Sequence, residues 1–139
     1  MKKLNILVIP SWYPTKENPI WGNYLLKQAD ALSEYANVSM LYVHIHPTRL
    51  VHTYMKEKRK DGYYQNLHKY PFYRSSILNL KPLNVDLSVN LYCKEVYKAY
   101  KKFIKFVGKP DIILAQAMLP AGFAAEYLSK MTKIPYVIH

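Results

Sequence analysis

A short buried strand, a proline-punctuated loop and a helix open this chain in that order, and the order limits the folds that it can adopt. Residues 4–9 are apolar except for one asparagine, as is typical of a central parallel strand covered on both faces. Prolines recur through residues 10–19, so this segment is predicted to be an ordered loop. A helix is expected to begin at Gly22 or Asn23, and a second strand is expected over 38–43. This strand–helix–strand unit predicts a parallel sheet with a right-handed crossover.

The later part of the chain repeats the alternation of helix and strand. Apolar residues at helical spacing predict a long helix over 86–107, closed by Gly108. The apolar run 111–115 predicts another buried strand. A further helix is expected to begin at Pro120, because proline is favoured at the first position of a helix. Residues 134–138 then predict a last strand.

The middle of the chain gives weaker signals. Residues 46–66 carry a dense charge run and a turn, and are interpreted as a loop or a short helix. Residues 69–74 predict a short strand, and Pro71 indicates that this strand lies at the edge of the sheet, because proline cannot donate a ladder hydrogen bond.

Together these elements predict an α/β fold, namely a Rossmann-like, doubly wound parallel sheet. The 139 residues fit one domain, which we expect to span 1–139. The last strand stops at His139 with no helix after it. We therefore expect the chain to be a fragment of a larger protein whose second domain is absent.

Composition and missing motifs exclude several classes of function. The single cysteine, Cys93, excludes an internal disulfide and favours a reducing, cytoplasmic compartment. No apolar run approaches the roughly 20 residues that cross a bilayer. His44, His46 and His52 have no Asp, Glu or Cys near them in sequence, so exposed imidazoles at a strand end are expected and no metal site. Ser11 lacks the glycines of a nucleophile elbow, and no carboxylate pair suits glycoside hydrolysis.

The formal net charge of +11 leaves two interpretations open. Lysines at 94, 98, 101 and 105 form a stripe along the helix 86–107, which fits a peripheral contact with an anionic membrane at the inner face. The simpler interpretation is a solvated helix face. No nucleic-acid-binding motif is present, so no nucleic-acid partner is expected.

The expected fold indicates where a ligand would bind. In a doubly wound sheet, ligands bind beyond the carboxyl ends of the strands where the strand order reverses, here between the first strand and the strand 111–115. The loops 10–21 and 116–119 flank that point, and each leads into a helix whose first amides suit an anion such as a diphosphate. Gly22 lies at one of these starts. Gly22 either lets a phosphate approach the backbone or forms an ordinary helix cap. No glycine-rich nucleotide-binding motif is present in the sequence.

Two blocks of residues resemble a known family. The first block contains Ser11-Trp12-Tyr13-Pro14, Pro19-x-x-Gly22-x-Tyr24, Gln28 and Ala31-Leu32. The second contains Pro110-Asp111-Ile112-Ile113-Leu114-Ala115-Gln116, Leu119-Pro120-Ala121-Gly122 and Ile134-Pro135-Tyr136-Val137-Ile138. In order and separation both blocks resemble the N-terminal, acceptor-side domain of family 4 retaining glycosyltransferases with the GT-B fold.

The resemblance implies half of a two-domain enzyme that transfers a sugar from a nucleotide-sugar to a glycan or lipid-linked acceptor. It implies no cofactor and no metal, with the nucleotide-sugar acting as the donor substrate. The donor diphosphate would contact Gly22 and Asn23. The acceptor would contact residues from both blocks, namely Trp12, Tyr13, Trp21, Gln116 and Pro120. Many family members act at membrane surfaces and have a basic N-terminal domain.

The chain also departs from the family pattern. Family members often have His-Ala-His where Leu114-Ala115-Gln116 stands, so an amide replaces an acceptor-binding histidine. His139 aligns with the threonine of a Thr-Glu-His-like ending. The catalytic histidine would therefore lie two residues beyond His139, and the catalytic residues stay unassigned. The alternative is a non-catalytic, basic Rossmann-like module that binds an anionic partner or a membrane surface.

Overall fold

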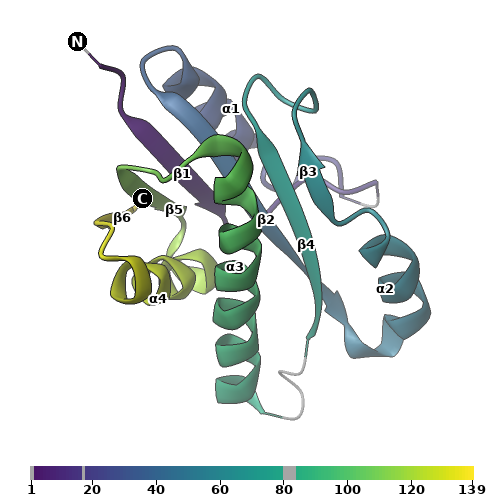
Figure 1. Ribbon diagram of the computed structural model, residues 1–139. Coiled ribbons are helices and arrows are strands. Elements are labelled where there is room, and N and C mark those ends of the chain that lie inside the picture. The colour runs from purple at the N-terminus through teal and green to yellow at the C-terminus, as the bar shows by residue number, and fades with distance from the viewer. Residues whose placement is uncertain (1, 17, 80–83) are drawn as a thin grey trace.

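The computed structural model describes residues 2–16, 18–79 and 84–139, which form a six-stranded sheet with helices on both faces (Figure 1). The strand order is β3-β4-β2-β1-β5-β6. The strands of this described part are β1 (Asn5–Pro10), β2 (Asn37–Pro47), β3 (Gly62–Tyr64), β4 (Phe72–Asn79), β5 (Ile112–Gln116) and β6 (Tyr136–Ile138). Neighbouring strands run parallel except for β3, which is antiparallel to β4. The predicted α/β fold is confirmed, with a mixed, mostly parallel sheet.

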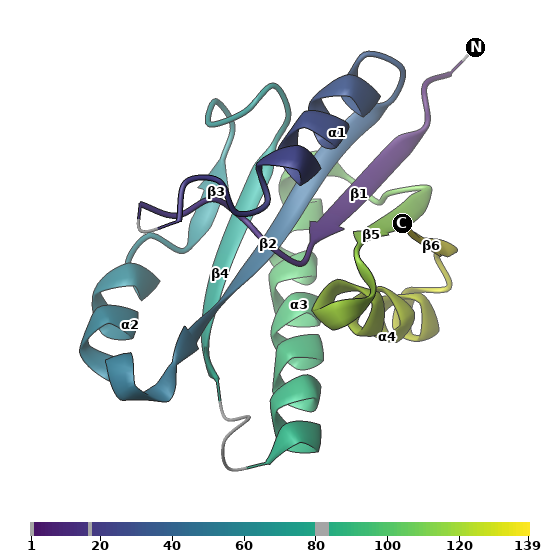
Figure 2. The same cartoon turned by 180° about the vertical axis from the view of Figure 1, so that it is seen from behind.

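Helices cover the two faces of the sheet in separate layers. The helices of the described residues are α1 (Asn23–Ser33), α2 (Val51–Lys58), α3 (Val85–Val107) and α4 (Phe123–Thr132), with short helical turns η1 (Thr48–Leu50) and η2 (Met118–Gly122). α3 and α4 lie side by side on one face, and α1 crosses the other face, as the views from the front and from behind show (Figures 1 and 2). The expected helix over 86–107 and its closure at Gly108, where φ is +80°, are confirmed.

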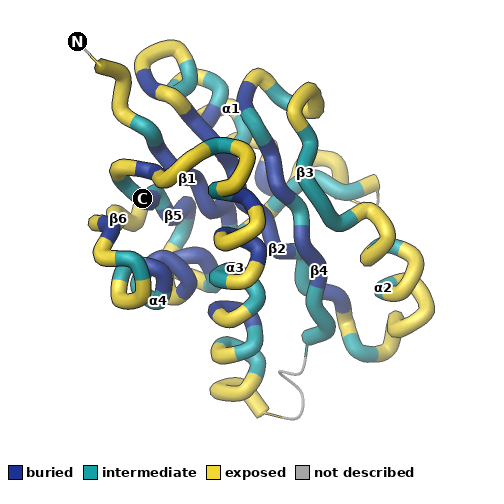
Figure 3. The backbone as a smooth tube through the Cα atoms, in the orientation of Figure 1, coloured by how far each residue is buried: buried dark blue, intermediate teal, exposed yellow. Residues whose placement is uncertain are grey.

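The central strands are buried from both sides, as their apolar sequences predict. On the α3 and α4 face, Leu7 of β1 and Ile113 of β5 pack in one cluster with Phe103. On the α1 face, Val8 and Met40 pack in a second cluster, together with further side chains from α1, β2 and β4. The buried strands and the exposed outer surfaces of the helices separate clearly in Figure 3. Burial of this kind is the dominant favourable contribution to folding.

Two strand predictions need correction. β2 runs to Pro47 instead of ending near Val43, and His46 within this extension is buried, not exposed as expected. β4 lies between β2 and β3, so it is not the edge strand that Pro71 suggested. Pro71 precedes β4: its carbonyl accepts a hydrogen bond from the Met40 amide, and the pairing with β2 begins at Phe72, so the missing N–H falls at the start of the ladder, where proline is tolerated.

The middle segment also differs from expectation. Residues 46–66 contain the end of β2, η1, α2 and the short strand β3, which is more order than a loop or a single helix. The predicted helix start at Pro120 agrees with the backbone. Within η2 only Leu119 departs from helical dihedral angles (φ −121°, ψ 132°), so the helical backbone resumes at Pro120 and continues into α4, which begins at Phe123.

Candidate functional site

The strand order reverses between β1 and β5, where the sequence placed the ligand site. β1 has β2 on one side and β5 on the other, and its last residue, Pro10, is in register with Gln116 at the end of β5. The loops that follow these two strands therefore leave the sheet side by side, at the carboxyl edge (Figure 2). Sheets of this kind bind ligands at such a position.

Ser11 ties the two loops together. Its backbone amide donates to the Gln116 carbonyl at 3.1 Å, and its side-chain hydroxyl accepts a hydrogen bond from the Ala121 amide at 3.2 Å. The expectation that the loop after β1 and the turn around Pro120 meet at one point is therefore confirmed. One amide at the start of the α4 region is bound by Ser11, and the first amide of α1, that of Asn23, donates to the Ile20 carbonyl at 3.2 Å, so each of the two anion-binding positions has one amide already bonded.

The structure shows why position 22 requires glycine, which the sequence alone could not decide. The backbone of Gly22 is left-handed, with φ at +72°, and a Cβ built on it would lie 2.6 Å from the Trp12 carbonyl oxygen. Its own carbonyl accepts hydrogen bonds from the amides of Leu25 and Leu26, as expected of a helix cap. Gly22 therefore holds the first loop against the start of α1, and Asn23 follows it as the first, exposed residue of the helix.

Gln116 lies buried where the two loops meet, with 1% of its surface exposed. Its Nε2 donates to the Leu25 carbonyl at 3.0 Å and to Oε1 of Gln28 at 3.3 Å, which links β5 to α1. Its Oε1 is buried and has no hydrogen-bond partner among the described residues. An unsatisfied buried acceptor costs about 1–3 kcal/mol, so this oxygen favours a ligand that carries a hydroxyl or amide donor.

The aromatic residues of the first loop divide into exposed and packed side chains. Trp12 and Trp21 are 38% and 62% exposed and stay open to a ligand. Tyr13 instead packs its ring 5.0 Å from Tyr42, and its hydroxyl lies 2.6 Å from Nε2 of His68. Burial raises the pKa of Tyr13 to about 12. Tyr13 therefore anchors the loop to β2.

His139 and Pro120, the remaining residues considered from the sequence, lie at the same edge. The His139 amide donates to the Ala115 carbonyl, and its carbonyl accepts from the Ala117 amide, so it continues the pairing of β6 with β5. With Gln28 and Gln116, it lines a shallow pocket of about 360 Å³ beside α1. Pro120 is half-buried in η2. Within the described residues, no three His, Cys, Asp or Glu side chains lie close enough to hold a metal ion.

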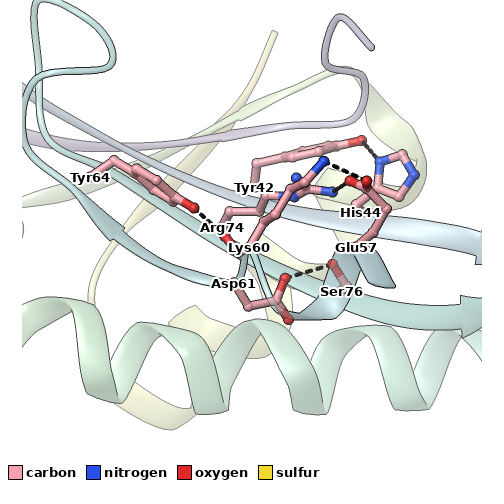
Figure 4. Close-up of polar contacts among 8 residues, drawn as sticks. All are labelled: Tyr42, His44, Glu57, Lys60, Asp61, Tyr64, Arg74 and Ser76. Carbon is pink, nitrogen blue, oxygen red and sulfur yellow. Dashed lines mark hydrogen bonds and ion pairs between the residues drawn. The ribbon is translucent and has the colours of Figure 1, made fainter. Parts of the chain in front are cut away.

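A polar network on α2 and β4 is absent from the sequence predictions (Figure 4). Glu57 pairs with Arg74 at 3.0 Å and also binds Lys60, and hydrogen bonds from these two cations, Lys60 first, lower its pKa to about 2. Asp61 accepts a hydrogen bond from the Ser76 hydroxyl at 2.6 Å, and desolvation raises its pKa. Arg74 and Ser76 point to one face of β4, but Ser75 between them is also polar, so the sequence of the strand carries no alternating pattern that would have indicated the network.

No protein-family model matches the chain, and no curated protein matches it. What the fold and the site define is an α/β domain with a mixed, mostly parallel six-stranded sheet and a switch point between β1 and β5. No helix in the described residues is both long enough and apolar enough to span a membrane.

Proposed function

We propose that this chain is the acceptor-side half of a retaining glycosyltransferase that transfers a sugar from a nucleotide-sugar to a glycan or lipid-linked acceptor. One observation carries the proposal: Ser11 joins the two resemblance blocks by bonding to Gln116 and Ala121 at the switch point. Residues far apart in the sequence thus come together at the edge where α/β sheets bind nucleotides. The Rossmann-like fold and the GT-B half belong to this proposal.

The donor diphosphate is assigned to the start of α1. Helix N-termini carry a partial positive charge and amides without helical partners, so they stabilise phosphate groups. Asn23 supplies the first helical amide, and Gly22 before it is buried against the Trp12 backbone, which fixes where the helix begins. The Asn23 amide donates to the Ile20 carbonyl at 3.2 Å in the free chain, so donor binding requires this amide to turn towards the phosphate.

The acceptor is assigned to the exposed rings and the buried amide beside this position. Trp12 and Trp21 offer aromatic faces on which a sugar ring can pack, with Tyr13 supporting the loop from behind. The unpartnered Oε1 of Gln116 can accept a hydrogen bond from an acceptor hydroxyl. The resemblance assigns most donor contacts to a second domain, so we expect this chain alone to bind both substrates without transferring sugar.

A titration with nucleotide-sugars tests the proposal. We expect UDP-glucose, UDP-N-acetylglucosamine or GDP-mannose to shift the backbone amide signals of Gly22 and Asn23 in NMR spectra of the labelled chain. Asn23→Pro removes the proposed phosphate donor together with its hydrogen bond to the Ile20 carbonyl, whereas Asn23→Ala keeps the N–H, and thermal melting checks that both variants fold. Asn23→Pro should therefore abolish the shifts and Asn23→Ala should retain them. Equal binding by both variants, or shifts remote from the switch point, contradicts the donor assignment.

One observation favours the second candidate, a non-catalytic basic module. The lysines at 94, 98, 101 and 105 are all exposed along α3, on the side opposite its buried residues Val96 and Phe103. A basic face of this kind suits an anionic surface. Salt-sensitive binding to such a surface, with no response to any nucleotide-sugar, is the result that favours the module over the enzyme.

A further inference from the structure

A polar pocket of about 450 Å³ lies at the amino-terminal edge of the sheet, opposite the switch point. It forms where β1 and β2 begin, at Asn5 and Asn37, and where α3 ends near Phe106. These segments meet at the end of the sheet that carries the N-terminus (Figure 1). Its volume is within the range of small-molecule binding sites, roughly 300–1,000 Å³.

Side-chain amides supply much of the chemistry of this pocket. Nδ2 of Asn37 donates to Oδ1 of Asn5 at 3.0 Å, which orients the two amides across neighbouring strands. Gln65, an exposed residue just after β3, brings a third amide to the lining. A side-chain amide carries two N–H donors and a carbonyl acceptor, so one group can bond to adjacent hydroxyls of a ligand.

Tyr70 gives an independent indication of a ligand. It lines the pocket, only 2% of its surface is exposed, and its hydroxyl is buried with no hydrogen-bond partner among the described residues. Buried polar groups are almost always paired, so each exception requires an explanation. A ligand hydroxyl that reached Tyr70 would supply the missing partner.

An aromatic pair and a low charge complete the lining. The rings of Tyr63 and Phe106 are stacked, with centroids 4.3 Å apart and planes only 5° from parallel, and Phe106 is 60% exposed. A flat, exposed ring of this kind can pack against the apolar C–H face of a sugar ring. Among the described residues that line the pocket, Lys69 is the one that carries a charge, so a strongly anionic ligand would find little compensation.

We propose that this amino-edge pocket binds a neutral saccharide. Phe106 supplies the packing surface, the amides of Asn5, Asn37 and Gln65 bind ring hydroxyls, and Tyr70 pairs with a hydroxyl that reaches the interior. The site is separate from the switch point, at the other end of the strands, and does not depend on any activity there. It would hold a stretch of glycan away from the position assigned to the nucleotide-sugar.

Titration of the labelled chain with maltotriose, cellotriose and chitotriose tests the proposal. At least one trisaccharide should shift the side-chain amide signals of Asn37 and Gln65. Phe106→Ala and Gln65→Ala should each weaken binding by about fivefold to tenfold. Tyr35→Ala is the matched control, because this ring is 79% exposed but lies outside the pocket lining, and it should leave the affinity unchanged.

Several outcomes overturn the proposal without affecting the proposed function. One is the absence of any NMR signal shift at millimolar trisaccharide. Another is a set of shifts confined to Trp12, Trp21 and Gln116, which would assign saccharide binding to the switch point. Inorganic phosphate that produces the same shifts through Lys69 would indicate an anion site instead. Gln65 is exposed, so its variant should fold even if Phe106→Ala proves unstable, and thermal melting checks both variants. Nucleotide-sugar binding is read separately at Gly22 and Asn23.

Discussion

At the scale of single residues, the switch point depends on a close contact between backbone segments. Gly22 has a left-handed backbone, and a Cβ added to it would lie only 2.6 Å from the Trp12 carbonyl oxygen, so two independent constraints require glycine at this position. The same contact places Trp12 against the start of α1. The packing of the first loop on α1 is therefore a property of the free chain, whereas the proposed diphosphate contact also requires the Asn23 amide to turn away from the Ile20 carbonyl.

We expect Gly22→Ala to destabilise the fold more than any substitution that introduces backbone strain alone. The left-handed conformation costs a non-glycine residue roughly 1–2 kcal/mol, and the clash with Trp12 adds to that cost. Chemical unfolding should show a loss of about 2 kcal/mol or more. Gly108→Ala introduces strain without a clash, because nothing lies within 4 Å of an added Cβ, but its backbone (φ +80°, ψ 176°) is in a region that only glycine adopts readily, so this variant should lose stability as well. A loss for Gly22→Ala smaller than the roughly 1–2 kcal/mol of left-handed strain would contradict the close approach.

At the scale of elements, α2 differs from the other helices in how it is attached. α2 contains no buried residue, whereas α1, α3 and α4 each bury several side chains. Its contacts with β4 are polar: Glu57 pairs with Arg74 (Figure 4), and Nζ of Lys58 donates to the Ser76 carbonyl at 3.2 Å. Elements with little apolar burial open at low free-energy cost, so the attachment of α2 should depend on the ionisation of Glu57.

Glu57→Gln tests this attachment through pH. The pKa of Glu57 lies at about 2, lowered chiefly by the hydrogen bond from Lys60, against an ordinary value of 4.5. Its stabilising contribution is therefore complete above pH 4.5 and is lost as the pH falls towards 2. Urea unfolding at neutral pH should show Glu57→Gln less stable than the unmodified chain, and the difference should vanish near pH 2.

Hydrogen exchange locates the same effect. At neutral pH, the amides of Val51–Lys58 should exchange faster in Glu57→Gln, while those of α3 should not change. The control is Glu34→Gln, which neutralises an exposed carboxylate at the end of α1. An identical pH dependence of Glu57→Gln and the unmodified chain would show that the pairing with Arg74 contributes nothing to stability.

The elements also show which parts of the fold a sequence can predict. α3 was predicted to within a residue because its apolar positions repeat over 23 residues, and β1 was predicted because a strand covered on both faces is apolar at almost every position. β3 was missed because three residues carry no periodic signal. The pairing of Glu57 with Arg74 joins residues from two elements, and such contacts appear only when the strand register is known.

The candidate site was likewise predictable only in part. That the loops after β1 and β5 meet could be predicted, because strand order alone determines where a doubly wound sheet reverses. Which loop residues stay available to a ligand could not be predicted. Tyr13 and Trp12 are neighbours of similar chemistry, yet Tyr13 packs on Tyr42 while Trp12 remains 38% exposed.

At the scale of the whole molecule, three surfaces with different chemistry lie on separate parts of one sheet. The switch point occupies the carboxyl edge, the amino-edge pocket lies at the other end of the strands, and the lysines of α3 line the outside of one helical layer. Different residues form the three surfaces, although Phe106 of α3 lines the pocket. The proposed membrane contact and the proposed ligand sites are therefore compatible in one molecule.

The lysine face of α3 should bind anionic vesicles in a salt-dependent manner. Each lysine close to an anionic bilayer contributes about 1 kcal/mol, so replacing Lys94, Lys98, Lys101 and Lys105 with Gln should weaken vesicle binding by roughly two to three orders of magnitude. Sedimentation with vesicles of mixed neutral and anionic phospholipid measures the loss, and rising salt should reproduce it in the unmodified chain. The control replaces four exposed lysines elsewhere, at positions 2, 3, 16 and 27, for the same change in net charge. If both sets of substitutions weaken vesicle binding equally, the attraction comes from net charge and not from the lysine face of α3. Stronger binding to a polynucleotide than to vesicles would identify a nucleic acid as the preferred anionic partner.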